Sequence, residues 1–250
     1  MKRGLIASLA VLALGLGSST QAAAASQIIV TPTNTQGWST ADTRLGGTVT
    51  FVADRTAPGH PHRGALQLTT NLTTTAKAQY LHAANTPLAD VTQASYHTKQ
   101  VSAVFPGGDP SYQVVVYLLG TSGFTTLVFE PYQNPLQGPV VNNVWQKWDV
   151  ANGFFWSTRT VTCPGGTIAG TPGGPATYTL SAITALCPNA VVIGFGVNIG
   201  TFNPGYVVRT DLFNFNGTVY NFEPSRGHGN DDANDENDNN DDGQGSDSEE

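Results

Sequence analysis

The sequence predicts an all-β fold, an antiparallel β-sandwich with one short helix. Short segments that alternate apolar and polar residues recur along the chain, and clusters of Gly, Asn, Ser and Pro separate them. This spacing of strand and turn signals is typical of two packed sheets. The central region is also poor in charge and rich in Thr, Asn, Gly, Val and Tyr. That composition favours strands in an extracellular protein.

The two ends of the chain differ from this central region. Residues 1–25 combine Lys2 and Arg3 with an apolar stretch and a run of alanines, which is the layout of a secretory signal peptide. Residues 225–250 are acidic and nearly devoid of apolar side chains, so we expect a disordered acidic tail. The β-sandwich domain is therefore expected to span residues 26–224, in a protein that is secreted or extracytoplasmic.

The charge distribution excludes some classes of partner. The chain has a formal net charge of −7. Residues 26–224 hold eight basic and eight acidic side chains, so the net acidity lies outside this domain. A neutral body gives no electrostatic footprint for nucleic acid. No segment after the apolar stretch reaches a membrane-spanning length, so we expect no membrane span.

The strand segments can be assigned in chain order. Each alternates or is rich in β-branched and aromatic residues, and the segments are 47–54, 64–70, 78–82, 100–105, 112–119, 123–130, 143–150, 153–159, 190–200, 205–215 and 218–222. Short turns predict three hairpins, which join 112–119 to 123–130, 143–150 to 153–159, and 205–215 to 218–222. The last turn is Asn216-Gly217.

One helix is expected between the later strands. It begins at Ser181, whose hydroxyl can cap it, and ends at Leu186, before Pro188. A single helical turn is also expected within residues 87–95. Cys163 and Cys187 are the two cysteines of the chain, and in an exported protein we expect them to form a disulfide.

The segment 191–200 has two unlike faces. Strict alternation places Val191, Ile193, Phe195, Val197 and Ile199 on a core face and leaves mostly glycines, with Asn198, on the other. Strand glycines mark a close approach by another group. Two interpretations remain open: an aromatic ring from a neighbouring strand covers them, or they form the floor of a shallow ligand groove.

Two glutamates share similar surroundings. Glu130 and Glu223 both follow Phe and precede Pro, and they are the glutamates of residues 26–224. A glycoside hydrolase needs two facing carboxylates, so this pair is the alternative catalytic site. The proline after each glutamate instead favours a strand end, where the carboxylate accepts backbone N–H groups or binds a structural cation. We expect no catalytic pair.

A cluster of aromatic residues suggests a ligand. Sugar rings stack on exposed aromatic faces, and nearby carboxylates or amides bind sugar hydroxyls. Alternation places Trp145 and Asp149 on one side of their segment and Trp148 on the other. The alternative is that these tryptophans fill the core. The predicted ligand-binding residues are Tyr132, Trp145, Trp148, Asp149 and Trp156.

Metal-site signals are weak. His60 and His62 flank a proline without a nearby third ligand, so a loop histidine pair is the better interpretation. The acidic tail matches the Ca²⁺-loop pattern of an EF-hand, but without flanking helices. We expect no cofactor, with a structural Ca²⁺ as the open alternative.

Several segments carry a resemblance, among them LVFEPY, WQKWDV, TLSAITALCPNAVVIGFGVNIG and GYVVRTDLFNF. Together they resemble a set of uncharacterised exported bacterial β-sandwich proteins over most of residues 45–224. More distantly, the final strands are similar to those of jelly-roll carbohydrate-binding modules. The resemblance implies a jelly-roll-like sandwich and carries over no catalytic residues.

The leading functional hypothesis is an exported, non-catalytic binding module. Its expected partner is a polysaccharide or a cell-envelope glycan. Two alternatives stay open: a glycoside hydrolase that uses Glu130 and Glu223, and a structural, envelope-associated protein without a small ligand.

Overall fold

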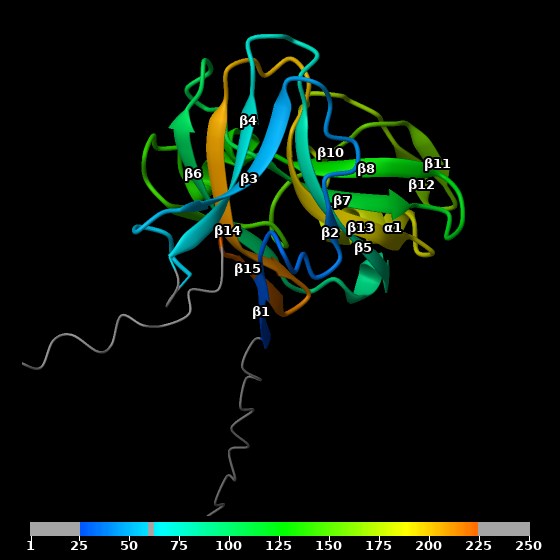
Figure 1. Ribbon diagram of the computed structural model, residues 1–250. Helices are drawn as coiled ribbons and strands as arrows, with labels where there is room; N and C mark the ends of the chain where they lie inside the picture. The colour runs from blue at the N-terminus through cyan, green and yellow to red at the C-terminus, as the bar shows by residue number, and fades with distance from the viewer. Residues whose placement is uncertain (1–25, 60–62, 225–250) are drawn as a thin grey trace, which may run out of the picture.

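The computed structural model describes residues 26–59 and 63–224. Two large β-sheets pack face to face in it (Figure 1), which confirms the predicted all-β sandwich. The predictions for the signal peptide, for His60 and His62, and for the acidic tail concern residues outside these ranges.

The first sheet has seven strands in the order β1-β15-β14-β4-β3, with β6 paired to β14 and β9 paired to β6. All pairs are antiparallel except β1 with β15. The strands are β1 (Ser26–Val30), β3 (Gly47–Ala53), β4 (Gly64–Thr70), β6 (Ala94–Ser102), β9 (Gln146–Asp149), β14 (Val207–Phe215) and β15 (Thr218–Phe222).

The second sheet has six antiparallel strands in the order β10-β8-β7-β13-β5-β2. They are β2 (Trp38–Ser39), β5 (Ala78–Pro87), β7 (Ser111–Tyr117), β8 (Phe124–Phe129), β10 (Trp156–Ser157) and β13 (Val191–Ile199). A small hairpin joins β11 (Val161–Cys163) to β12 (Gly166–Ile168). The helical segments are α1 (Leu180–Leu186) and the 3-10 turns η1 (Leu88–Asp90), η2 (Pro131–Gln133) and η3 (Pro135–Gln137).

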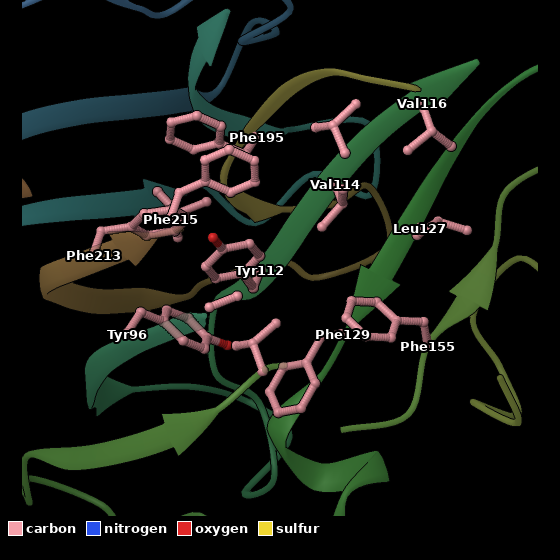
Figure 2. Close-up of a cluster of buried hydrophobic side chains, with 14 of the residues drawn as sticks. Tyr96, Tyr112, Val114, Val116, Leu127, Phe129, Phe155, Phe195, Phe213 and Phe215 are labelled. Atoms are coloured by element: carbon pink, nitrogen blue, oxygen red, sulfur yellow. The ribbon is translucent and has the colours of Figure 1, made fainter. Parts of the chain in front are cut away.

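The core between the two sheets is rich in aromatic rings (Figure 2). Tyr112 of β7 stacks on Phe213 of β14 with ring centroids 4.2 Å apart. Phe195 of β13 stacks on Phe215 of β14 at 4.0 Å. These pairs join one sheet to the other, and such ring contacts add to the stabilisation from apolar burial.

Two of the three predicted hairpins are confirmed. Strands β7 and β8 pair from Tyr117↔Phe124 onward. Strands β14 and β15 meet at Asn216 and Gly217, whose positive φ angles of 50° and 88° match a tight hairpin turn.

The third predicted hairpin is wrong. Strand β9 pairs with β6 in the seven-stranded sheet, whereas β10 pairs with β8 in the six-stranded sheet. The turn near Asn152 therefore carries the chain from one sheet to the other. Burial decides this outcome, because the crossing places Trp148 and Phe155, both fully buried, in the same core.

Strand β13 does not alternate throughout. Its pairing with both neighbours shifts between Val192 and Gly194, which is a β-bulge. Val192 pairs with Val116 and Phe195 with Val114, so both face the core. The prediction that Val191 and Ile193 share the core face of Phe195 is therefore wrong, because the extra residue switches the alternation.

The β13 glycines admit a neighbouring backbone. A Cβ atom on Gly196 would lie 2.2 Å from the carbonyl oxygen of Tyr80 on β5. A Cβ atom on Gly194 would lie 3.2 Å from the carbonyl oxygen of His82. At these two positions, neither a covering ring nor an open groove explains the glycine.

The predicted helix, turn and disulfide are present. Helix α1 begins after Thr179, whose hydroxyl accepts the N–H of Ala182. Thr179, rather than Ser181, is therefore its N-cap. Turn η1 lies within the expected segment. Cys163 and Cys187 are bonded, which confirms the predicted disulfide.

Candidate functional site

A pocket of about 420 Å³ opens on the outer face of the six-stranded sheet. Its size lies in the range of small-molecule sites. Loops at one end of the sandwich surround it: the β6–β7 loop, the segment after β8, the turn at Pro172 and Gly173, and the β13–β14 loop.

The pocket floor consists of outward-facing strand residues. Gln113, Val128 and Trp156 are cross-strand partners on β7, β8 and β10, so their side chains form one row. Ser111 and Asn198 form the next row on β7 and β13. The same strands send Tyr112, Val114, Leu127 and Phe129 into the core. Alternation thus builds the pocket and the core from the same segments.

Two floor amides differ in how they are held. The Asn198 amide donates to Gln79 Oε1 at 2.9 Å, which fixes its orientation within the sheet. The Gln113 side chain makes no hydrogen bond to any part of the chain that the structure describes. It is half-buried in the pocket floor, so its amide is available to a ligand.

Glu130 stands at the pocket wall, directly after β8. Its backbone is extended, with φ −122° and ψ 127°, as expected before proline. Its Oε2 accepts hydrogen bonds from Trp156 Nε1 at 2.7 Å, Tyr132 Oη at 3.2 Å and Gln133 Nε2 at 2.5 Å. Burial raises the pKa of Glu130, and these three donors oppose that rise by stabilising the carboxylate.

Aromatic rings form the walls around Glu130. Tyr132 is 41% exposed and packs edge-on against Phe105, with ring centroids 5.3 Å apart. Phe202 projects from the β13–β14 loop and is 79% exposed. Tyr206 lies deeper and is buried, with its ring against Gly108. Exposed rings at the mouth of a polar pocket suit a ligand with both apolar and polar faces.

Asp109 also lines the pocket, but its carboxyl group is hydrogen-bonded to Thr98 of β6. Thr98 Oγ1 donates to Asp109 Oδ2. Asp109 Oδ1 is sealed from solvent and has no partner among residues 26–59 and 63–224. Burial raises the pKa of Asp109 to about 8, against the lowering effect of Thr98 and Trp148. Burial therefore favours the neutral form of this carboxyl group.

The structure brings two of the predicted ligand-binding residues together. Tyr132 and Trp156 line the pocket and meet at Glu130. Trp145, Trp148 and Asp149 belong to the β9 segment of the other sheet and do not line it.

The prediction that Trp148 contacts a ligand does not fit its burial. Trp148 is fully buried, and its indole donates to Thr98 Oγ1 at 2.6 Å. Trp145 is half-buried, and Asp149 is exposed and accepts from Asn152. The alternation of these side chains was predicted correctly, but the inward side is the core.

Glu130 and Glu223 lie in different sites. Glu223 follows β15 in the seven-stranded sheet and is fully buried. It does not line the pocket that holds Glu130. Both glutamates directly follow a strand, as expected from the prolines after them.

Glu223 belongs to a second polar cluster, with Asp211 and Asn221. Asp211 Oδ1 accepts the N–H of Phe222 at 3.0 Å, and its Oδ2 accepts the N–H of Gly59 at 3.1 Å. Burial raises the pKa of Asp211 to about 7, and the Glu223 carboxylate adds to this rise. Burial likewise raises the pKa of Glu223 to about 7.

The second cluster contains side-chain atoms without partners. Both carboxyl oxygens of Glu223 and the amide nitrogen and oxygen of Asn221 are sealed from solvent. None of these four atoms makes a hydrogen bond of normal geometry within the described chain. The Gly64 N–H and the Asn221 amide face Glu223 closely enough to lower its pKa. Two carboxyl groups and an amide oxygen form the kind of donor set that Ca²⁺ takes, so these residues fit such an ion.

Other metal signals are missing from the described residues. They hold no group of three or more His, Cys, Asp or Glu side chains that could bind a metal ion. Within the same ranges, no helix is long and apolar enough to cross a membrane.

Sequence reasoning missed several pocket residues, among them Phe105, Asp109, Gln113, Phe202 and Tyr206. Gln113 gave a usable signal, because it is a polar residue in a strand segment that is otherwise apolar or aromatic. Asn198 and Gly200 line the pocket, and they belong to the face of segment 191–200 for which a ligand groove was one of the two interpretations. The loop residues gave no signal, because their approach to the pocket depends on how the two sheets stack.

Comparisons with known proteins leave the family open. No family model matches the chain, and no curated relative matches it. The chain is similar to a family 11 carbohydrate-binding module from Clostridium thermocellum, solved with a β-1,3-1,4-mixed-linked tetrasaccharide. Identity is 12% and the TM-score is 0.39, over 76% of this chain and 91% of that one.

A second similar structure is the family 11 module of the cellulosomal cellulase Lic26A-Cel5E of Clostridium thermocellum. Identity is 11% and the TM-score is 0.38, over 75% of this chain and 89% of that one. Both TM-scores are below 0.5, so the similarity assigns neither a family nor a ligand to this chain.

Proposed function

We propose that this protein is an exported, non-catalytic carbohydrate-binding module whose binding site is the pocket beside Glu130. The observation that carries the proposal is the meeting of Trp156 and Tyr132 at the Glu130 carboxylate, above a floor that includes the Gln113 amide. A pyranose ring has apolar faces and a rim of hydroxyl groups. Aromatic rings would take the faces, and the carboxylate and amide would take the hydroxyls.

Binding without hydrolysis is favoured over a glycoside hydrolase. Hydrolysis needs two carboxyl groups that face the same glycosidic bond. Glu223 lies outside the pocket. Of the two Asp109 carboxyl oxygens, Oδ1 is sealed from solvent and Oδ2 accepts from Thr98. Glu130 is left without an accessible partner acid among the lining residues. The hydrolase that uses Glu130 and Glu223 is therefore the weaker alternative.

The disulfide supports the proposal of export. A bond between Cys163 and Cys187 persists in an oxidising compartment and is rare in a reducing cytosol. A module in that setting would meet a polysaccharide or a cell-envelope glycan. A structural protein without a small ligand is the remaining alternative, and the pocket disfavours it.

A glycan array with the purified protein tests the proposal. We expect binding to at least one polysaccharide or oligosaccharide, weakened tenfold or more in Trp156→Ala because the variant removes both a wall of the pocket and a donor to Glu130. Phe124→Ala is the matched control, because Phe124 is a part-exposed aromatic residue that does not line the pocket. Binding of no glycan, or equal binding by both variants, would overturn the proposal.

We also propose that Asp211, Asn221 and Glu223 hold a structural Ca²⁺. The ion would supply a positive charge to the carboxyl oxygens of Glu223 and the amide oxygen of Asn221, which are sealed from solvent without a hydrogen-bond partner in the described chain. It would join the end of β15 to β14, where Asp211 lies, and to the start of β4 at Gly64.

Thermal unfolding in Ca²⁺ and in EDTA tests the ion site. We expect wild type to melt at a higher temperature in Ca²⁺, and Glu223→Gln to lose most of that difference. Asp90→Asn is the control, because it removes an exposed carboxylate elsewhere. The same melting temperature for wild type in both solutions would show that no such ion stabilises the fold.

A further inference from the structure

We infer that the glycan bound in the pocket carries a positively charged amino group, as a hexosamine does, and that this group pairs with Glu130. The inference rests on the proposed function and narrows its ligand class. It follows from the charge of the pocket, from the hydrogen bonds of one carboxylate, and from the rings around it.

The pocket has one carboxylate and no basic side chain. Asp109 and Glu130 are the acidic residues among the described lining residues, but burial favours the neutral form of Asp109, and no lining residue is Lys, Arg or His. A glycan with uronate or sulfate groups would meet no positive charge there and would be repelled by Glu130. A ligand with a positive group has the complementary charge.

Glu130 is arranged as a carboxylate that still lacks a counter-ion. Its Oε2 accepts from Trp156, Tyr132 and Gln133, whereas its Oε1 accepts none of these hydrogen bonds. Among the residues that the structure describes, the ion pairs are Lys99 and Arg209 with Asp54, so Glu130 has no basic partner. A part-buried carboxylate without a counter-ion costs free energy, which a ligand ammonium would recover.

The rings next to Glu130 leave Oε1 free. Trp156 and Tyr132 both reach Oε2 with their polar atoms, so their ring edges stand beside the carboxylate. Both rings also line the pocket, where they would pack against the sugar that carries the ammonium. A neutral sugar hydroxyl could also donate to Oε1, but it would leave the carboxylate charge without a counter-ion.

Two oligosaccharides of equal length and linkage test the inference. Isothermal titration at pH 6 and 0.15 M salt would compare a β-1,4-linked glucosamine hexamer with its fully N-acetylated counterpart. Most of the amino groups are protonated at this pH, whereas the acetamides are neutral. We expect wild type to bind the glucosamine hexamer at least tenfold more tightly.

Glu130→Gln should remove this preference, because the amide keeps the shape of the side chain without its charge. Asp149→Asn is the matched control: it removes one exposed carboxylate outside the pocket and should leave the preference unchanged. A melting temperature for each variant establishes that it is folded. A preference that survives in Glu130→Gln would show general attraction to the acidic chain and overturn the inference.

The outcomes also separate the inference from the proposed function. Equal or tighter binding of the acetylated hexamer would overturn the amino-group inference, and so would array binding restricted to neutral glycans. Both results would leave carbohydrate binding intact. Binding of no glycan by array or titration would overturn both proposals.

Discussion

The indole nitrogen of Trp148 donates a 2.6 Å hydrogen bond to the hydroxyl oxygen of Thr98, deep between β9 and β6. Thr98 in turn donates to Asp109 on the β6–β7 loop. One hydroxyl group therefore joins a core tryptophan to a loop that lines the pocket. This relay gives Thr98, an unremarkable residue in the sequence, a structural role.

Thr98→Val should destabilise the protein by about 2 kcal/mol. The substitution keeps the shape of the side chain but removes the hydroxyl, so Trp148 Nε1 and Asp109 Oδ2 both lose a buried partner. Urea denaturation measures the loss. Thr98→Ser keeps the hydroxyl and should retain most of the wild-type stability. Equal stability of Thr98→Val and wild type would show that the relay contributes nothing.

Asp109 should make the free energy of unfolding decrease as the pH rises from about 4 to about 8. Its pKa is raised from 3.8 to about 8 in the folded protein. Between these values the folded state keeps a proton that the unfolded chain has lost, so stability is full below pH 3.8 and falls as pH rises toward 8. Asp109→Asn should weaken this decline and gain stability over wild type as pH rises.

Chemical denaturation of both proteins from pH 4 to pH 8 measures that effect. The difference between the two proteins matters, because other titrating groups contribute to both profiles. Parallel profiles at all pH values would show that Asp109 titrates near its ordinary pKa.

Gly196→Ala should be strongly destabilising, by about 2 kcal/mol or more. The new Cβ atom would lie 2.2 Å from the backbone oxygen of Tyr80, and a strand backbone cannot move away without breaking its ladder. Gly200→Ala is the control, because its nearest neighbour would be Asn198 Oδ1 at 3.4 Å. Melting temperatures of the two variants should differ by several degrees, and two equal values would contradict the close packing of β13 on β5.

Removal of the disulfide should cost about 3 kcal/mol, because the bond closes a loop between residues 24 apart in the chain. The double variant Cys163→Ala, Cys187→Ala should therefore unfold at a lower urea concentration. Wild type treated with a reductant should show a similar shift. A variant as stable as oxidised wild type would contradict this expectation.

The sequence predicted the elements whose determinants are local. Alternation identified most strands, Asn216-Gly217 identified a hairpin turn, and the cysteine pair identified the disulfide. The helix was found within one residue at its start. The strands, the turn and the helix depend on residues that are neighbours along the chain. The disulfide was predictable because the chain has two cysteines, which allow one pairing.

The features that were missed depend on contacts between distant segments. Residues 143–159 looked like one hairpin, because a short turn says nothing about which sheet each strand joins. Trp148 looked like a ligand contact, because the sequence does not tell which side of an alternating strand meets the core. Asp109 and Tyr206 meet at the pocket only because two loops reach the same end of the sandwich.

The parallel pairing of β1 with β15 determines which side of the molecule faces a surface or a fusion partner joined next to Ser26. Ser26 pairs with Thr218, beside the Asn216-Gly217 turn, whereas the pocket loops border Val207 at the other end of β14. Figure 1 shows β1 at the far end of the sandwich from the loops that follow β4 and β13. A surface, a label or a larger protein joined next to Ser26 would thus face away from the pocket mouth. A molecule immobilised from that side would present the pocket outward.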